Sequence, residues 1–322
     1  MSPQRETADA AILVLLAAGA ALVPFTLSGY EIKLATTITI QAGLAVALGL
    51  VVGPAGLISM GHAAFYGLGA YLLAMAAPQS AAADLLLTLV LSIAGAAAFA
   101  GVVGAVSIRS RGMYFILMTL AFGQLGYHVF HDTGVAGSAD GAYIYFRPEL
   151  NLPWGTVTLD KPADFYMFVW VVVFAVIAAC WWLRRSAFGS ILLAARDNEP
   201  RTRAFGYSPY LARLIAFVIS GAMAGAMGYL TAAQHGYVAP EMLGWHASAI
   251  ALVMVLLGGK DMTSGPAVGA VLLLLAEEML QRATEHWLLG VGLIIILVVI
   301  VAPQGLVPWA ANALLFRRVR HA

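Results

Sequence analysis

Long hydrophobic runs dominate this chain, and short polar intervals separate them. A helix needs about 20 apolar residues to cross a bilayer, so the runs predict ten spans. The predicted fold class is all-α, a polytopic membrane protein with about ten transmembrane or re-entrant helices in a single transmembrane domain over residues 1–322. The predicted spans cover about 10–28, 34–52, 57–78, 84–107, 113–131, 165–183, 211–232, 245–259, 265–283 and 287–302.

One polar interval, residues 184–213, stands out between two of these runs. It holds six arginines and two carboxylates. Residues 190–196 are good helix formers, Pro200 is typical of a bend, and Gly206 followed by Pro209 indicates a helix stop and restart. The pattern predicts a short helix in a structured loop that meets a partner. The alternative is a charged connector that only sets the topology.

The lysines and arginines indicate which side each loop occupies. With ten spans and both termini inside, 13 of the 17 basic residues fall on the cytoplasmic side. The positive-inside rule favours this orientation. It makes 184–213 cytoplasmic and the longest outer loop, 132–164, periplasmic. That loop could cap the pathway, dock an external partner or be a passive surface loop.

Composition excludes several classes of protein. The chain is 61% hydrophobic and 10% charged, against roughly 25% charged residues in soluble domains. Its net charge of +1 implies no basic surface for nucleic acid. Cys180 is the single cysteine and cannot form an intrachain disulfide. No cleavable signal is expected, because the first apolar run is long for a signal core.

Chemical motifs are missing from the sequence. It has no Walker A signature, no metal-ligand cluster and no Ser-His-Asp or paired-carboxylate arrangement. The chain is therefore not expected to be an enzyme or to bind a metal or cofactor. If ATP drives it, another chain must bind the ATP.

A broken helix is predicted at residues 53–71, where Pro54 and five glycines interrupt an apolar run. Broken helices in membranes line cavities or are buried in protein. The interval is either a gate element or a tight turn followed by an ordinary helix, with His62 bonded to a neighbour. The candidate pathway residues, each polar within a predicted span, are Gln41, Ser59, His62, Thr119 and Gln124. Each could instead serve hydrogen bonding between helices.

Pairs of small residues spaced four apart predict close helix contacts. They occur at Gly221 and Gly225, at Ala224 and Gly228, and at Gly49 and Gly53.

Four short stretches of sequence, taken together and in their order along the chain, are more informative than any one of them. They are Gly53-Pro-Ala-Gly56 through Ser59-Met-Gly61-His62 to Tyr71; Arg111-Gly-Met-Tyr-Phe115 with Thr119-Leu-Ala-Phe122-Gly-Gln124; Ala195-Arg196-Asp-Asn198-Glu199 with Ala204 and Gly206; and Gly258-Gly259 with Gly265-Pro266. Together they resemble the permeases of branched-chain amino acid ABC importers, of the LivM type.

The resemblance implies a role for the 184–213 interval as the segment that couples the permease to an ATPase. The residues carried over for this role are Arg196, Asp197, Asn198, Glu199, Ala204 and Gly206. It also implies a second permease subunit, two ATPase subunits that bind ATP, a periplasmic substrate-binding protein and a bacterial inner membrane.

The function expected from this resemblance is import of a small polar solute, with branched-chain amino acids as the leading expectation. Departures from the family pattern at Gly49, Pro54 and Lys260-Asp261 leave substrate identity open, and permeases for urea or amides are alternatives. The rival classes are an ion-coupled secondary transporter or channel, which would need intramembrane charges, and a membrane-embedded enzyme.

Overall fold

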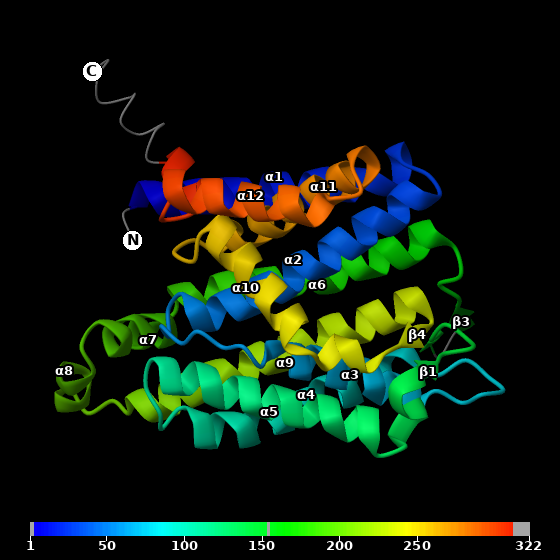
Figure 1. Cartoon of the computed structure of the whole chain (residues 1–322), viewed down its shortest axis with the longest axis horizontal. Helices are drawn as coiled ribbons and strands as arrows, with labels where there is room; N and C mark the ends of the chain where they lie inside the picture. Colours follow the sequence, from blue (N-terminus) through cyan, green and yellow to red (C-terminus); the bar gives the residue numbers. More distant parts are fainter. Residues whose placement is uncertain (1–2, 153–154, 312–322) are drawn as a thin grey trace.

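Ten helices occupy the ten apolar runs in the computed structural model, which describes residues 3–152 and 155–311. Most of them run along the long axis of the molecule (Figure 1). They are α1 (Pro3–Thr26), α2 (Tyr30–Val52), α3 (His62–Ala76), α4 (Leu85–Ser107), α5 (Met113–Asp132), α6 (Pro162–Arg185), α9 (Pro209–His235), α10 (Trp245–Gly258), α11 (Ser264–Ala283) and α12 (Trp287–Val301).

Among the described residues, six helices are long and apolar enough to cross a membrane: α1, α2, α4, α5, α6 and α9. Helices α3, α10 and α12 are apolar but have only 14 or 15 residues. At 1.5 Å per residue they span roughly 22 Å, less than a bilayer core of about 30 Å. The chain is thus a polytopic helical protein in which about ten helices contribute, not all by full crossings.

The predicted span at 57–78 is wrong over its first residues, because α3 begins only at His62. Residues 53–61 form an irregular segment. Gly56 has a φ of +68°, a left-handed conformation that interrupts a helix and favours glycine. Pro54 also lacks the N–H that a helix interior requires.

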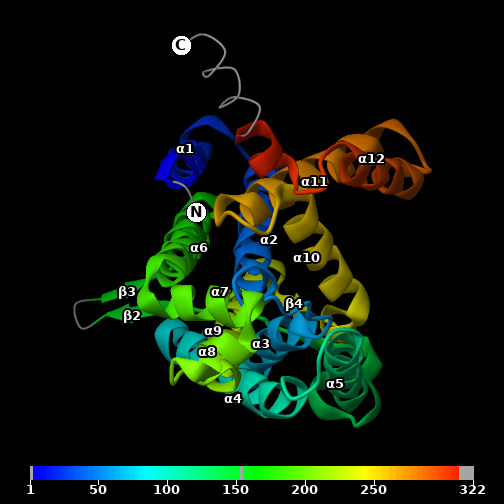
Figure 2. The same ribbon diagram turned by 90° about the vertical axis from the view of Figure 1, so that its left-hand side faces the viewer.

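Helices α2 and α9 lie at the centre of the bundle. Figure 2 shows α2 in the middle of the end-on view, with α1, α12 and α5 at the periphery. Large side chains buried here include Leu48, Tyr229 and Leu230. The predicted small-residue contacts are confirmed, since Gly221 and Gly225 face the alanines of α4 and Gly49 faces Pro266.

Two short helices, α7 (Ala187–Asp197) and α8 (Glu199–Ala204), fill the polar interval between α6 and α9. The predicted helix at 190–196 is confirmed and is longer than expected. We refer to residues 187–204 as the elbow.

The elbow and both ends of the described chain lie at one end of the bundle (Figure 1). The opposite end carries the loop predicted at 132–164.

This outer loop contains short regular elements that were not predicted. They are the 3₁₀ helix η1 (Val135–Asp140) and the strands β1 (Ala142–Tyr143), β2 (Leu150–Leu152) and β3 (Gly155–Val157). β2 and β3 form an antiparallel hairpin. β1 pairs with β4 (Tyr237–Val238), which precedes the 3₁₀ helix η2 (Pro240–Leu243). The loop is therefore fastened to the connection between α9 and α10.

Candidate functional site

The elbow is shaped by side chains that cap its helices. Ser186 Oγ accepts a hydrogen bond from the Gly189 amide at 3.4 Å and begins α7. Asn198 Oδ1 accepts from the Arg201 amide at 3.0 Å and begins α8. Such caps satisfy the free N–H groups of a helix start. The chain therefore makes two defined helices here rather than a flexible connector.

Glu199 is the electrostatic centre of the elbow. Its carboxylate pairs with Arg203 at 2.6 Å, with Arg213 at 3.0 Å and with Arg111 at 3.2 Å. The Glu199 side chain is only 16% exposed. Burial acts to raise the pKa of Glu199, but the hydrogen bond and charge of Arg213 and the charges of Arg111 and Arg203 outweigh it, so the pKa lies below its usual value.

This cluster joins three parts of the chain. Arg111 precedes α5, and Arg213 lies in the first turns of α9. Arg213 Nη2 also donates to the carbonyl of Ala195 in α7 at 2.9 Å. These contacts link α8 to α9 and to the turn before α5 by charge-assisted hydrogen bonds, which are stronger than neutral ones.

Two other arginines reach from this end into the bundle. Arg196 Nη1 donates to the carbonyl of Gly53 at 2.9 Å. Arg184 Nη2 donates to the carbonyl of Lys260 at 3.0 Å. Both acceptors lie in turns that connect membrane helices.

The remaining predicted coupling residues lie at the surface of the elbow. Asp197 pairs with Arg196 at 3.2 Å, and its side chain is 68% exposed. Ala204 ends α8, and Gly206 follows with a φ of +85°. Five of the six predicted coupling residues thus lie in the elbow and Gly206 follows it directly, and Arg196, Asn198 and Glu199 also make the defining contacts of the elbow. Their contact with an ATPase stays a prediction.

Three of the predicted pathway residues meet at the start of α3. Ser59, His62 and Thr119 are all buried. His62 Nδ1 lies 2.9 Å from Ser59 Oγ, and the amide of Met60 donates to Thr119 Oγ1 at 3.2 Å. These contacts tie the irregular segment to α3 and α5.

The far side of the His62 ring contacts α9. His62 Nε2 lies 2.8 Å from Ser220 Oγ, and Ser220 donates its own hydroxyl proton to the carbonyl of Ala47 at 2.6 Å. Since the Ser220 proton is used, Nε2 must be the donor, and Nδ1 accepts from Ser59. Both ring nitrogens of His62 are therefore occupied, as in the hydrogen-bonded interpretation of this residue.

Gln41 and Gln124 do not join this group. Gln41 Nε2 donates to the hydroxyl of Tyr66 at 3.4 Å, and that hydroxyl donates to Thr231 at 2.8 Å. Gln124 Nε2 is buried and has no hydrogen-bond partner among the described residues. The pathway role of all five residues stays a prediction.

Sequence reasoning missed Asp9, which is 4% exposed. Its carboxylate accepts hydrogen bonds from the amides of Thr263 and Ser264 at 3.3 and 2.8 Å, and from the Ser264 hydroxyl at 2.6 Å. An acidic residue at the edge of the first apolar run was the available signal, because a carboxylate close to the membrane interior needs partners.

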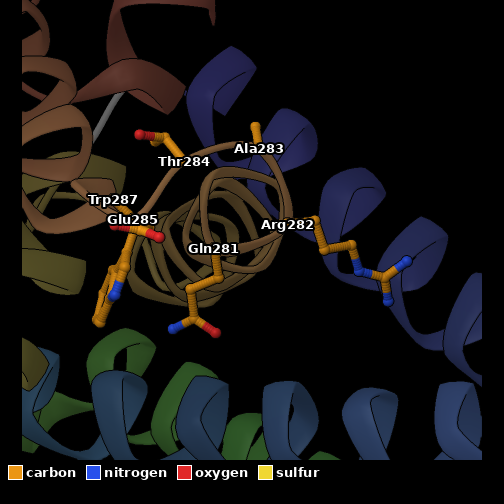
Figure 3. Close-up of a pocket in the computed structure, with 6 residues that line it drawn as sticks. All are labelled: Gln281, Arg282, Ala283, Thr284, Glu285 and Trp287. Atoms are coloured by element: carbon orange, nitrogen blue, oxygen red, sulfur yellow. The ribbon is translucent and has the colours of Figure 1, made fainter.

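A hollow of about 750 Å³ opens at the turn between α11 and α12. Figure 3 shows Arg282 pointing to the right while Gln281 and Trp287 point downward, so the side chains do not converge on one point. The hollow contains none of the predicted site residues. Within residues 3–152 and 155–311, no three His, Cys, Asp or Glu side chains are grouped to hold a metal ion.

Comparisons with known proteins agree with the sequence blocks. The family described as "Branched-chain amino acid transport system / permease component" matches residues 31–302. The chain is 31% identical to the high-affinity branched-chain amino acid transport system permease protein LivM of Escherichia coli, over 92% of this chain and 74% of that protein. LivM of Salmonella typhimurium is also 31% identical, over 88% of this chain and 72% of its own length.

A more limited match is the autoinducer 2 import system permease protein LsrC of Klebsiella pneumoniae, 32% identical over 36% of this chain and 34% of its own. No solved structure matches the chain significantly. With the family match over most of its length, the helical bundle and the capped elbow, the chain belongs to the family of branched-chain amino acid transport system permease components, the membrane components of ABC importers, and is a transport subunit rather than an enzyme.

Proposed function

We propose that this chain is the permease subunit of a bacterial inner-membrane importer for branched-chain amino acids. It acts with a second permease subunit, two ATPase subunits and a periplasmic substrate-binding protein. The two LivM relatives, which align with about nine-tenths of the chain, support this assignment. Both termini and the elbow face the cytoplasm, in keeping with the distribution of basic residues.

The single observation that carries the proposal is the Glu199 cluster. One poorly exposed carboxylate binds arginines from α8, from α9 and from the turn before α5. Within this cluster the Glu199 and Arg213 side chains are mostly buried, at 16% and 15% exposed, so removing either one leaves the charge of the other unpaired and is costly. The elbow therefore moves as a unit with the helices behind it, which is the property needed in a segment that an ATPase pushes.

The substrate is the least constrained part of the proposal. Hydroxyls and amides in the bundle interior, such as those of Ser59, Thr119 and Gln124, suit a small polar solute but do not by themselves select an amino acid. Uptake of leucine, isoleucine and valine by the reconstituted complex, against urea and acetamide as competitors, separates these substrate classes. If urea or acetamide is a substrate and the three amino acids are not taken up, the amino acid assignment is contradicted.

Glu199→Arg tests the coupling role. The change places a fourth guanidinium group among those of Arg111, Arg203 and Arg213. The four positive charges repel one another, so the elbow separates from α9. We expect ATP-driven uptake of labelled leucine by proteoliposomes containing the complete complex to be abolished, with membrane insertion retained. Glu285→Arg, at an exposed acidic site in the turn between α11 and α12, is the matched control and should transport normally.

Normal uptake by the Glu199→Arg variant would remove the coupling role. Solute accumulation by the purified subunit alone, driven by an ion gradient, would instead identify a secondary transporter.

A further inference from the structure

The irregular segment 53–61, which leads from α2 to α3, is fastened to the elbow at its first turn. Arg196 on α7 donates to the carbonyl of Gly53 at 2.9 Å. The same side chain lies along Gly56, where an added Cβ would come 2.6 Å from Arg196 Cγ. A glycine is required at this point for space as well as for its φ of +68°.

The apolar face of α7 makes a second contact with the same turn. Ala55 is buried in a small cluster with Leu192 of α7 and with Ala212 and Ala216 of α9. The elbow therefore holds residues 53–56 both by a charge-assisted hydrogen bond and by close packing.

The other end of the segment is fastened to the bundle interior. There Met60 donates to Thr119, and Ser59 and His62 are bonded to each other. The amide of Ala63, in the first turn of α3, donates to Ser248 Oγ of α10 at 2.8 Å. A displacement at residues 53–56 thus reaches the start of α3 through only a few intervening residues.

The turn between α10 and α11 lies against the same place. Arg184 binds the carbonyl of Lys260, and an added Cβ on Gly53 would run into that carbonyl. The two inner turns therefore touch, and each receives an arginine from the α6–α7 region.

We infer that Arg196 is a positioning residue for transport, which carries movement of the elbow into segment 53–61 and so to the start of α3. The inference rests on the proposed coupling function and adds the route that the movement takes. Arg196 holds the segment by direct contact, whereas Glu199 holds the elbow to α9 and to the turn before α5.

Arg196→Ala in the complete complex tests this route. It removes the bond to Gly53, the side chain along Gly56 and the exposed ion pair with Asp197, but it leaves the Glu199 cluster in place. We expect the ATPase subunits to co-purify and to hydrolyse ATP, while leucine taken up per ATP hydrolysed falls about fivefold or more. Arg185→Ala is the matched control, because Arg185 binds Glu6 on α1 and makes no bond to the segment.

A label on the segment separates transmission from simple stability. Ile58 is 40% exposed, and the native Cys180 is buried at 1% exposure, so Ile58→Cys supplies the one accessible thiol. We expect its maleimide labelling rate to change on adding ATP when Arg196 is present and to stay constant in the Arg196→Ala background.

Gly56→Ala provides a second variant if Arg196→Ala does not insert. The added methyl pushes the Arg196 side chain away while keeping its charge, so we expect the same loss of uptake per ATP. Both changes break the same contact, but Gly56→Ala also places a side chain at a φ of +68°, so the double variant should lose no more uptake per ATP than Gly56→Ala alone.

Normal uptake per ATP in both variants, or an ATP response of Ile58→Cys that persists without Arg196, would overturn the route. Failure of the ATPase subunits to bind the unaltered permease would instead overturn the proposed coupling function.

Discussion

At the residue scale, several buried polar groups are satisfied by partners distant in sequence. Asp9 is the clearest case, because its side chain, on α1, accepts hydrogen bonds from the amides at the start of α11. Thr263, the residue that precedes α11, makes no side-chain capping bond, and Asp9 supplies the acceptor in its place. A carboxylate is also favoured at a helix N-terminus by the helix dipole. α1 is thereby fastened to α11.

Asp9→Ala should therefore destabilise the protein. The amides of Thr263 and Ser264 lose their acceptor, at a cost of about 1–3 kcal/mol. We expect a lower midpoint of thermal unfolding in detergent, measured by size-exclusion chromatography after heating. Asp9→Asn keeps one acceptor oxygen and should lose less; an Asp9→Ala midpoint equal to the unaltered protein would show that water replaces the carboxylate without cost.

At the element scale, α9 is an unusually close neighbour of α3 and α4. The carbonyls of Tyr66 and Gly225 lie where side chains on Gly228 and Gly69 would stand, and Ala96 and Ala100 lie against Gly225 and Gly221. Small residues let helix backbones approach where lipid supplies no hydrophobic drive. The four-residue spacing predicted contacts of this kind, and the structure identifies the partners.

Gly228→Ala tests this packing. The methyl would meet the backbone of Tyr66, which cannot move aside as a side chain can, so we expect a loss of about 1–3 kcal/mol and a lower thermal midpoint. Gly19→Ala is the control, since nothing lies within 4 Å of its added Cβ. Equal midpoints for the two variants would argue against close contact between α3 and α9.

At the scale of the whole molecule, the two ends of the bundle differ. One end carries the elbow, with its arginines and the first and last described residues, and the other carries the strands of the outer loop (Figure 1). An importer needs this difference, because one end must meet an ATPase and the other a binding protein.

Labelling of single cysteines tests the orientation. Tyr207 follows the elbow and Tyr145 lies in the outer loop, with exposures of 52% and 66%. We expect a membrane-impermeant maleimide to label Tyr145→Cys in spheroplasts and Tyr207→Cys only after permeabilisation. Labelling of Tyr207→Cys from outside would reverse the topology and with it the proposed function.

Local signals in the amino-acid sequence were enough to predict the helical runs, the polar interval 184–213 and the family. These signals are apolar length, clustered arginines, and glycine and proline at helix ends. The sequence also placed Ser59 and His62 beside a break in the chain. The folded chain was needed to show that α3 begins at His62, that Glu199 binds Arg111, and that Asp9 binds Ser264, 255 positions away. Hydrophobic patterning reports how deeply a residue is buried, whereas a buried polar group is stabilised by whichever partner the folded chain brings within about 3 Å, and no local signal names that partner.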